Sequence, residues 1–432
     1  INLALELNDG GVQAGQVYLG KTEAYVPSDA GVVIQGHIAE IEVNEWLNVW
    51  NGIEQQSDSS KGNNPLTEIK LSSDRITYND LNFEHVKVQI KNNYPQWQFN
   101  IDAPIAKGLV EIEPGMPINL DLDYIHWPML VDESSEEEGE SEQDPLINIR
   151  PEALPNINLA VDEIFIGATN YGRWNLNTET FEDGIRIKNI DGEIKKLSVK
   201  GDVEWNKPTK PGHPQYTFLD LNLSSNDVGG IQSAWKMKPA VDAESGKAHV
   251  KFKWFGSPAD FEMESLNGDF NLQLKDGRFI EAGEAGALGA FGLLNFGSIG
   301  RRLRLDFTDV YESGVHFDSV KGKGVINNGV VHVVDTFNVD GPAAKFAMSG
   351  EVNMLTQELN QELSVTFPIS STLPFVAILA GFAPPVAASL FVGERLVGDE
   401  IEKYTSATYE LTGKWDDPKL KLKKRFDNEI EG

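Results

Sequence analysis

Few residues of this 432-residue chain have the types and spacings that catalysis requires. Its seven histidines are scattered, and none has the spacing of a zinc-binding HExxH helix. Ser298 lies in Gly297–Gly300, which is one residue shorter than a nucleophile elbow. There is no Walker A loop and no GxGxxG, and without cysteine there is no thiolate nucleophile or thiolate metal site. We therefore predict no enzymatic activity, no metal and no cofactor.

Carboxylates are the remaining catalytic candidates. Asp306 with Asp309, and Glu262 with Glu264, have the residue types of a glycosidase acid and base. Because the chain holds 66 acidic residues, such pairs are expected by chance, and we interpret them as surface groups. The insert 132–144 holds eight carboxylates and no basic residue. It lacks the glycine that an EF-hand turn requires at its sixth position, so we interpret it as a solvated loop.

Aromatic side chains offer a second kind of chemistry, the stacking of sugars. The chain has nine tryptophans, and Trp97, Trp205 and Trp254 alternate in phase with apolar neighbours. This phase favours a role in a core or in the lining of a groove over sugar binding.

The charge balance excludes some partners. The chain has 37 basic and 66 acidic residues, and its net charge is −29. This balance argues against nucleic acid as a partner, because phosphate contacts need a positive surface, and charge alone would not hold the chain on an anionic membrane. The chain begins at Ile1 inside an alternating run, with no visible signal peptide, so we expect a fragment of a longer protein.

Alternation of apolar and polar residues is the dominant pattern, and it predicts β-strands with one apolar and one solvated face. It recurs at 86–90, 97–101, 118–122, 157–161, 219–223, 250–254, 270–274 and 303–307. Asp-Gly or Asn-Gly occurs eight times and favours tight hairpins, so we expect an antiparallel meander. These dipeptides begin at Asp9, Asn51, Asp183, Asp191, Asn267, Asp276, Asn328 and Asp340.

The size of the sheet limits its shape. About 25 strands fit this chain length, and open sheets rarely exceed about 10 strands without curling or splitting. No Gly/Ser linker separates sandwich domains, and the polar insert 55–64 reads as another loop. We predict a mainly β fold, in which one long antiparallel meander curls into an open apolar groove. The segments expected are 1–145 with its acidic loop 132–144, 146–260, and 261–427.

Helices are predicted in few places. One or two turns fit 45–50, and 285–296 is apolar but rich in glycine. From 363 to 393 there is no charged residue, and Pro374, Pro384 and Pro385 interrupt the segment. One spanning helix needs about 20 consecutive apolar residues, so we expect two short helices, 375–383 and 386–402.

An open apolar groove suggests lipid transfer, because acyl chains fit such a slot while their headgroups stay in water. Each buried CH₂ contributes about 0.8 kcal/mol, so only continuous apolar contact offsets extraction from a bilayer. An envelope scaffold or assembly factor without a lipid ligand, and a carbohydrate-binding β protein, remain as alternatives. The side chains predicted to line the groove are Leu221, Phe252, Trp254, Leu272, Leu305 and Phe307.

The apolar segment 373–402, which is uncharged through Gly393, is predicted to contact a membrane, and the alternative is that it caps the end of the groove. Lys403 and the basic tail 419–425 would then lie close to the headgroups. The predicted membrane-contacting side chains are Phe375, Ile378, Leu379, Phe382, Leu390 and Phe391.

Several segments, in their order along the chain, resemble one known family. GHIAEIEVNEWLNVW at 36–50 is similar to an element of the AsmA-like superfamily. LNGDFNLQLKDGRFIE at 266–281, DGPAAKFAMSGEVNM at 340–354 and YELTGKWDDPKLKL at 409–422 resemble the C-terminal region of its YhdP-type members. PEALPNINLAVDEIFIG at 151–167 extends the similarity toward the N-terminus.

The resemblance implies a bridge-like carrier that moves phospholipid across the periplasm of a Gram-negative bacterium. It implies a helix outside this chain as the inner-membrane anchor, and an outer-membrane contact near 373–402. It offers no role for the acidic insert 132–144, which departs from the family pattern.

Overall fold

We analysed a computed structural model of the chain. It describes residues 1–8, 11–43, 66–78, 81–127, 144, 146–210, 212–237, 240–280, 315–342, 344–368, 393–397, 400–415 and 417–425. The chain is mainly β, and the 23 strands of these described residues belong to one open mixed sheet. The chain divides into two compact units. The N-terminal unit comprises Ile1–Ser141, Glu152–Phe181 and Ile187–Ile194, and the C-terminal unit comprises Glu142–Pro151, Glu182–Arg186 and Lys195–Gly432.

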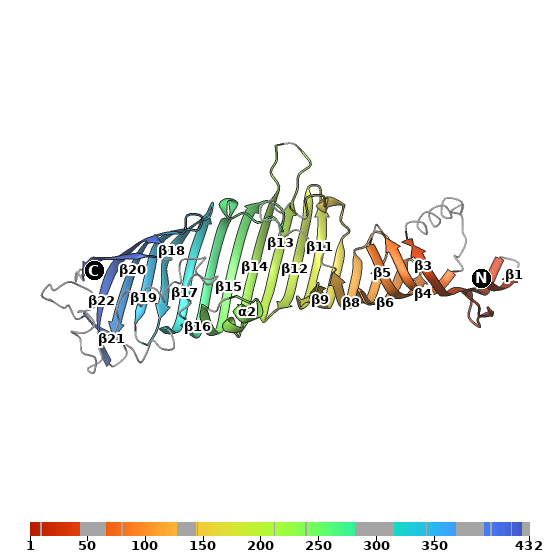
Figure 1. Cartoon of the computed structure of the whole chain (residues 1–432), viewed down its shortest axis with the longest axis horizontal. Helices are drawn as coiled ribbons and strands as arrows, with labels where there is room; N and C mark the ends of the chain where they lie inside the picture. Colours follow the sequence, from red (N-terminus) through yellow and green to blue (C-terminus); the bar gives the residue numbers. More distant parts are fainter. Residues whose placement is uncertain are drawn as a thin grey trace. The chain divides into compact units, whose positions relative to one another are not determined.

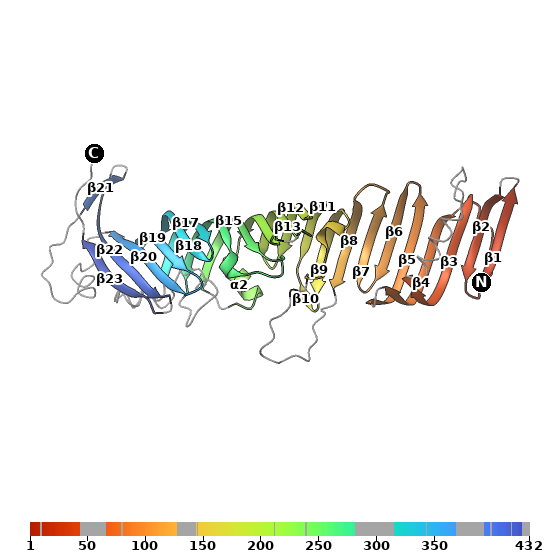
Figure 2. The same ribbon diagram turned by 90° about the horizontal axis from the view of Figure 1, so that it is seen from above.

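The N-terminal unit is built from long strands that follow one another in sequence (Figures 1 and 2). A short 3₁₀ turn, Pro151–Ala153, precedes β9. The strands are β1 (Asn2–Asn8), β2 (Gly11–Leu19), β3 (Gly31–Glu42), β4 (Leu66–Tyr78), β5 (Leu81–Asn93), β6 (Gln96–Ala103), β7 (Ala106–Ile112), β8 (Ile118–Trp127), β9 (Ile157–Ile166), β10 (Thr169–Asn170), β11 (Arg173–Phe181) and β12 (Gly184–Ile194), whose first residues belong to the C-terminal unit.

The described residues of the C-terminal unit continue the same pattern, with helix α2 (Val228–Ala234) between β14 and β15 and a 3₁₀ turn at Met263–Ser265. Its strands are β13 (Leu197–Asn206), β14 (Tyr216–Ser225), β15 (Val241–Phe255), β16 (Asn267–Phe279), β17 (Val315–Asn327), β18 (Val330–Asp340), β19 (Lys345–Asn353), β20 (Glu358–Pro368), β21 (Gly393–Val397), β22 (Glu400–Lys414) and β23 (Lys419–Arg425).

Most neighbouring strands are antiparallel, as predicted, but three pairings are parallel: β2 with β3, β3 with β4, and β8 with β9. A parallel pairing needs a crossover connection, and each of these has a long one: 20–30, 43–65 and 128–156. The polar insert 55–64 and the acidic insert 132–144 lie in the second and third connections. The inserts therefore lengthen two of the connections that join parallel strands.

Seven of the eight Asp-Gly and Asn-Gly dipeptides fall into two groups, and the eighth, at Asn51, lies outside the described residues. Those at Asp9 and Asn328 connect consecutive antiparallel strands, as expected for hairpins, while the one at Asp340 begins at the end of β18 and the one at Asp183 lies in the short connection from β11 to β12. Those at Asp191, Asn267 and Asp276 lie inside β12 and β16. At Gly277 a Cβ would lie 2.4 Å from the Asp242 carbonyl oxygen and 2.7 Å from the Phe317 ring. There the glycine permits a close approach instead of a turn.

The helix predicted at 386–402 is wrong in its C-terminal part. Gly393–Val397 forms β21, which pairs antiparallel with β22, and β22 already begins at Glu400. A short hairpin accounts for the helical spacing of apolar residues there, since a brief apolar run does not distinguish the two structures. The helices predicted at 45–50, 285–296 and 375–383 lie outside the described residues. Within the described ranges, no helix combines the length and apolar character needed to cross a bilayer.

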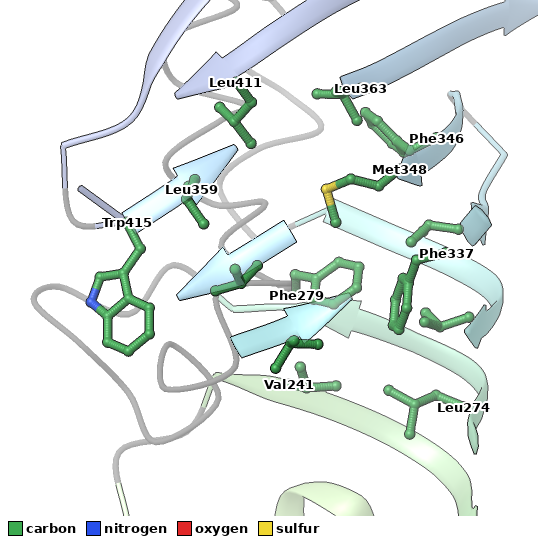
Figure 3. Packing of buried hydrophobic residues seen from close by; sticks show 14 of the residues in the cluster. Val241, Leu274, Phe279, Phe337, Phe346, Met348, Leu359, Leu363, Leu411 and Trp415 are labelled. Atoms are coloured by element: carbon green, nitrogen blue, oxygen red, sulfur yellow. The ribbon is translucent and has the colours of Figure 1, made fainter. Parts of the chain in front are cut away.

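A cluster of buried hydrophobic side chains lies in the C-terminal unit, across β15–β20 and β22 (Figure 3). Phe337 and Met348 are opposite each other on β18 and β19 and are essentially unexposed. Gly322 lies beneath the Phe337 ring, where a Cβ would be 1.8 Å from a ring carbon. Other members that are fully buried are Val320, Val331, Val339, Val352, Leu363, Val365 and Leu411.

One polar side chain interrupts this core and leads to a stability prediction. Gln361 of β20 is 3% exposed, and neither its amide nitrogen nor its amide oxygen has a hydrogen-bond partner. Because a buried unpaired polar group costs about 1–3 kcal/mol, Gln361→Leu should raise the free energy of unfolding by about 1 kcal/mol or more. Urea unfolding measures this change. Gln273→Leu, on the solvated face, is the control and should change it little; a destabilised Gln361→Leu would contradict the prediction.

Candidate functional site

An unbroken row of apolar side chains crosses ten strands of the N-terminal unit. Each member is the direct cross-strand partner of the next, through antiparallel and parallel pairings alike. Nine steps of about 4.8 Å give the row a length of about 43 Å. Its members, from β1 to β9 and β11, are Leu3, Val17, Ile34, Ile69, Ile90, Phe99, Val110, Leu120, Leu159 and Leu176.

The side chains of this row, which we call the first row, are neither fully buried nor fully exposed. Leu3 is 61% exposed, and the other nine side chains are half-buried. A second row runs beside it: Leu19, Gly36, Leu71, Val88, Ile101, Gly108, Leu122, Val161 and Trp174. At Gly108 the φ angle is +140° and a Cβ would lie 2.4 Å from the Asp121 carbonyl oxygen, so the pairing with β8 requires glycine. Together the two rows form a continuous apolar face.

The opposite face of these strands is polar and internally hydrogen-bonded. The Asn158 side chain links to Asn119 and Asn177, both at 2.7 Å. Gln89 donates to Glu68, and Lys70 lies 2.6 Å from the same carboxylate. Burial alone would raise the pKa of Glu68, but these hydrogen bonds and the charge of Lys70 outweigh it and lower the pKa. The sheet therefore has one face suited to apolar ligands and one suited to water.

In the C-terminal unit, the middle of β13–β16 forms a similar half-buried apolar surface, which we call the open floor. Val203, Leu219 and Phe252 are successive cross-strand partners on it. The register places the predicted side chains Leu221, Phe252 and Leu272 together on this surface. Its other half-buried members are Leu223, Val250 and Phe270.

Buried rims flank the open floor. On one side, Trp205, Thr217 and Trp254 are consecutive cross-strand partners, all nearly unexposed. The Trp254 indole donates to the Ser257 carbonyl oxygen at 3.0 Å. The Phe261 ring packs edge-on against the indole, with the two ring centroids 5.4 Å apart. The predicted groove residue Trp254 is therefore a rim residue with a satisfied indole and does not lie on the open floor.

Helix α2 forms the other rim. Its N-terminus is capped by Asp227, whose carboxylate accepts from the Gly230 backbone at 2.7 Å. Gln232 is buried and bonds both the Ala240 amide and the Val241 carbonyl at the start of β15. Val228 packs over Gly246, because a Cβ on that glycine would lie 2.9 Å from a Val228 methyl group. α2 therefore covers the apolar face at one end of β15.

The outward face behind the open floor is charged. Asp220 lies 2.7 Å from His249 and 3.2 Å from Lys251. Burial alone would raise the pKa of Asp220, but the hydrogen bonds from His249 and Lys251 and their charges lower it overall. Lys251 and Gln273 point to this side, since they alternate with Phe252 and Leu272.

A separate cleft of about 670 Å³ opens beside the ends of β15–β17. Asp227, Asp242, Asp276, Arg278 and His316 contribute to its walls. Arg278 pairs with Asp242 at 3.2 Å. No group of three metal-ligating side chains converges among the described residues, so this cleft offers no assembled metal centre.

The remaining predicted site residues lie outside the described ranges. These are the groove residues Leu305 and Phe307, and the membrane-contacting residues Phe375, Ile378, Leu379, Phe382, Leu390 and Phe391. The two long rows of the N-terminal unit were not among the predicted site residues. Their signal was present in the alternating runs at 86–90, 97–101, 118–122 and 157–161, but only the register joins them into rows.

Comparison with known proteins agrees with this geometry. The family model "YhdP protein" matches residues 1–420. The curated protein "Intermembrane phospholipid transporter YhdP" of Escherichia coli (strain K12) is 30% identical over 280 residues, which are 63% of this chain. Those residues span 21% of the relative's own length, about a fifth. No solved structure matches the chain. The match to the family model covers nearly the whole chain, and the chain belongs to the YhdP family.

Proposed function

We propose that this chain binds phospholipids by their acyl chains along its apolar face and carries them between the two membranes of a Gram-negative envelope. The observation that carries the proposal is the first row, which is apolar across ten strands and stays half-buried from Val17 to Leu176. Each acyl CH₂ placed on such a surface gains about 0.8 kcal/mol relative to water. The headgroup would stay in solvent at the open side.

The proposal requires no chemical step. An acyl chain that leaves a bilayer exchanges one apolar environment for another, so a continuous row keeps the free energy nearly level along the path. A polar gap would create a barrier, and the first row has none between β1 and β11. The relative's name, an intermembrane phospholipid transporter, supports phospholipid as the cargo.

The proposal extends to the cellular setting. The chain would lie in the periplasm, between an inner-membrane anchor outside this chain and an outer-membrane contact at 373–402. The resemblance and the family membership support this setting.

Site-specific photo-cross-linking tests the proposal. A photoreactive residue at Phe252 or Leu272, on the open floor, should capture phospholipid in cells. Lys251 and Gln273 precede or follow these positions on the same strands but face the charged side, so they serve as matched controls. Equal capture at all four positions would refute the assignment of the apolar face.

A further inference from the structure

The apolar surface of the C-terminal unit changes character along a single cross-strand row. That row runs through Val203, Leu219, Phe252, Gly268, Ile326, Val331, Val352 and Leu359, on β13–β20. Its first four members are half-buried. From Ile326 onward they are 1%, 0%, 0% and 4% exposed. The boundary lies between β16 and β17, within one continuous ladder.

The closure extends along most of the length of β17 and β20. On β17 the inward residues Val320, Gly322, Gly324 and Ile326 are all buried. On β20 the inward residues Leu359, Gln361, Leu363 and Val365 are all buried as well. On β14, by contrast, only the ends of the strand are buried, at Thr217 and Ser225, and the three leucines between them are half-buried.

Large side chains occupy the closed part. The Phe337 ring lies directly over Gly322, and Phe279 and Phe317 pack together with ring centroids 4.8 Å apart. Figure 3 shows the side chains of Phe337, Met348 and Phe346 close to one another in this core. Protein cores of this kind leave few voids larger than a water molecule, so an acyl chain has no room there unless the core opens.

We infer that the acyl-accessible surface of this chain ends at β16, and that the core over β17–β22 is an end-stop that lipid does not enter. This inference rests on the proposed lipid binding and adds where the bound lipid stops. An acyl chain that advances along β13–β16 meets packed side chains at β17. It must therefore leave the open floor away from the sheet, between the Trp254 rim and α2.

Cysteine labelling tests the end-stop on the full chain, which has no native cysteine and so no background. Val203→Cys, Val331→Cys and Val352→Cys place the same substitution at three positions of one row. The probe is a phosphatidylcholine with a maleimide at the end of one acyl chain, supplied in phosphatidylethanolamine and phosphatidylglycerol vesicles. The readout is the thioether adduct, measured by mass spectrometry.

Val203→Cys should form the adduct. Val331→Cys and Val352→Cys should form it at least about tenfold more slowly, because the probe must wait for a local opening of the core. All three should react equally in urea, and circular dichroism reports whether each variant folds; if one core variant fails to fold, the other serves. Equal labelling of the folded Val203→Cys and core variants would overturn the end-stop. No labelling at Val203→Cys would instead count against the proposed lipid binding itself.

Discussion

Phe252→Asp is expected to remove most of the phospholipid that the C-terminal unit binds, while the chain still folds. Phe252 lies in the middle of the open floor, between Leu219 and Gly268 on the neighbouring strands. A carboxylate there would meet acyl chains without a partner, which costs several kcal/mol in the lipid-bound state. In the lipid-free state the side chain is only half-buried and reaches water, so the cost to folding is small.

Phospholipid retained per mole of purified protein, together with the melting temperature, measures this prediction. Gln273→Asp adds the same charge on the solvated face of the next strand and should retain normal lipid. A Phe252→Asp variant that folds and retains as much lipid as the control would show that the open floor is not the binding surface.

Phe337→Ala is expected to have the largest effect on stability. The ring is unexposed, opposes Met348 and fills the space over Gly322, where no other side chain can take its place without rearrangement. Truncation of a buried phenylalanine costs about 3–5 kcal/mol, through lost burial and the cavity left behind. Urea unfolding of the C-terminal unit measures the loss.

Phe218→Ala is the matched control for this change. Phe218 lies on the outward face of β14 and is 37% exposed, so its truncation should cost about 0.5 kcal/mol or less. If the two variants lost similar free energies of unfolding, the core over β17–β22 would be looser than its burial indicates, and the end-stop would lose its physical basis.

The sequence predicted the strands well because alternation is a local property. Leu219, Leu221 and Leu223 share a face in any β-strand, whatever the strand pairs with. The hairpin dipeptides at Asp183 and Asn328 likewise act through their own backbone. The open mixed sheet, its few helices and its apolar face all follow from these local signals and the length of the chain.

Register and bulges could not be predicted in the same way. Asp276 has a φ angle of +50°, and around it β16 changes phase, so that Phe279 faces inward together with Leu274. A slip of one residue reverses every side chain that follows, and no local pattern marks where it occurs. The parallel pairings depend on long crossovers, which a hairpin-based expectation misses.

The local alternation of apolar and polar residues also could not predict which part of the sheet forms the open floor and which part forms the closed core. Phe252 and Val352 lie in one row, and each stands between two polar neighbours in the sequence. One is half-buried and the other is unexposed, because burial depends on what lies over the face. Trp254 is a second example. The alternation around it indicated that the side chain lies on the apolar face, but it did not indicate that the residue belongs to a buried rim.

The central claim is that the apolar face holds lipid, and native lipid extraction tests it most directly. The chain is purified without detergent, its lipids are extracted, and mass spectrometry identifies and counts them. A triple variant with Ile90, Phe99 and Val110 changed to Asp interrupts the first row on three adjacent strands. The account predicts phospholipid on the native chain and a clear loss on the folded variant. A native chain free of phospholipid, or equal phospholipid on both, would contradict it.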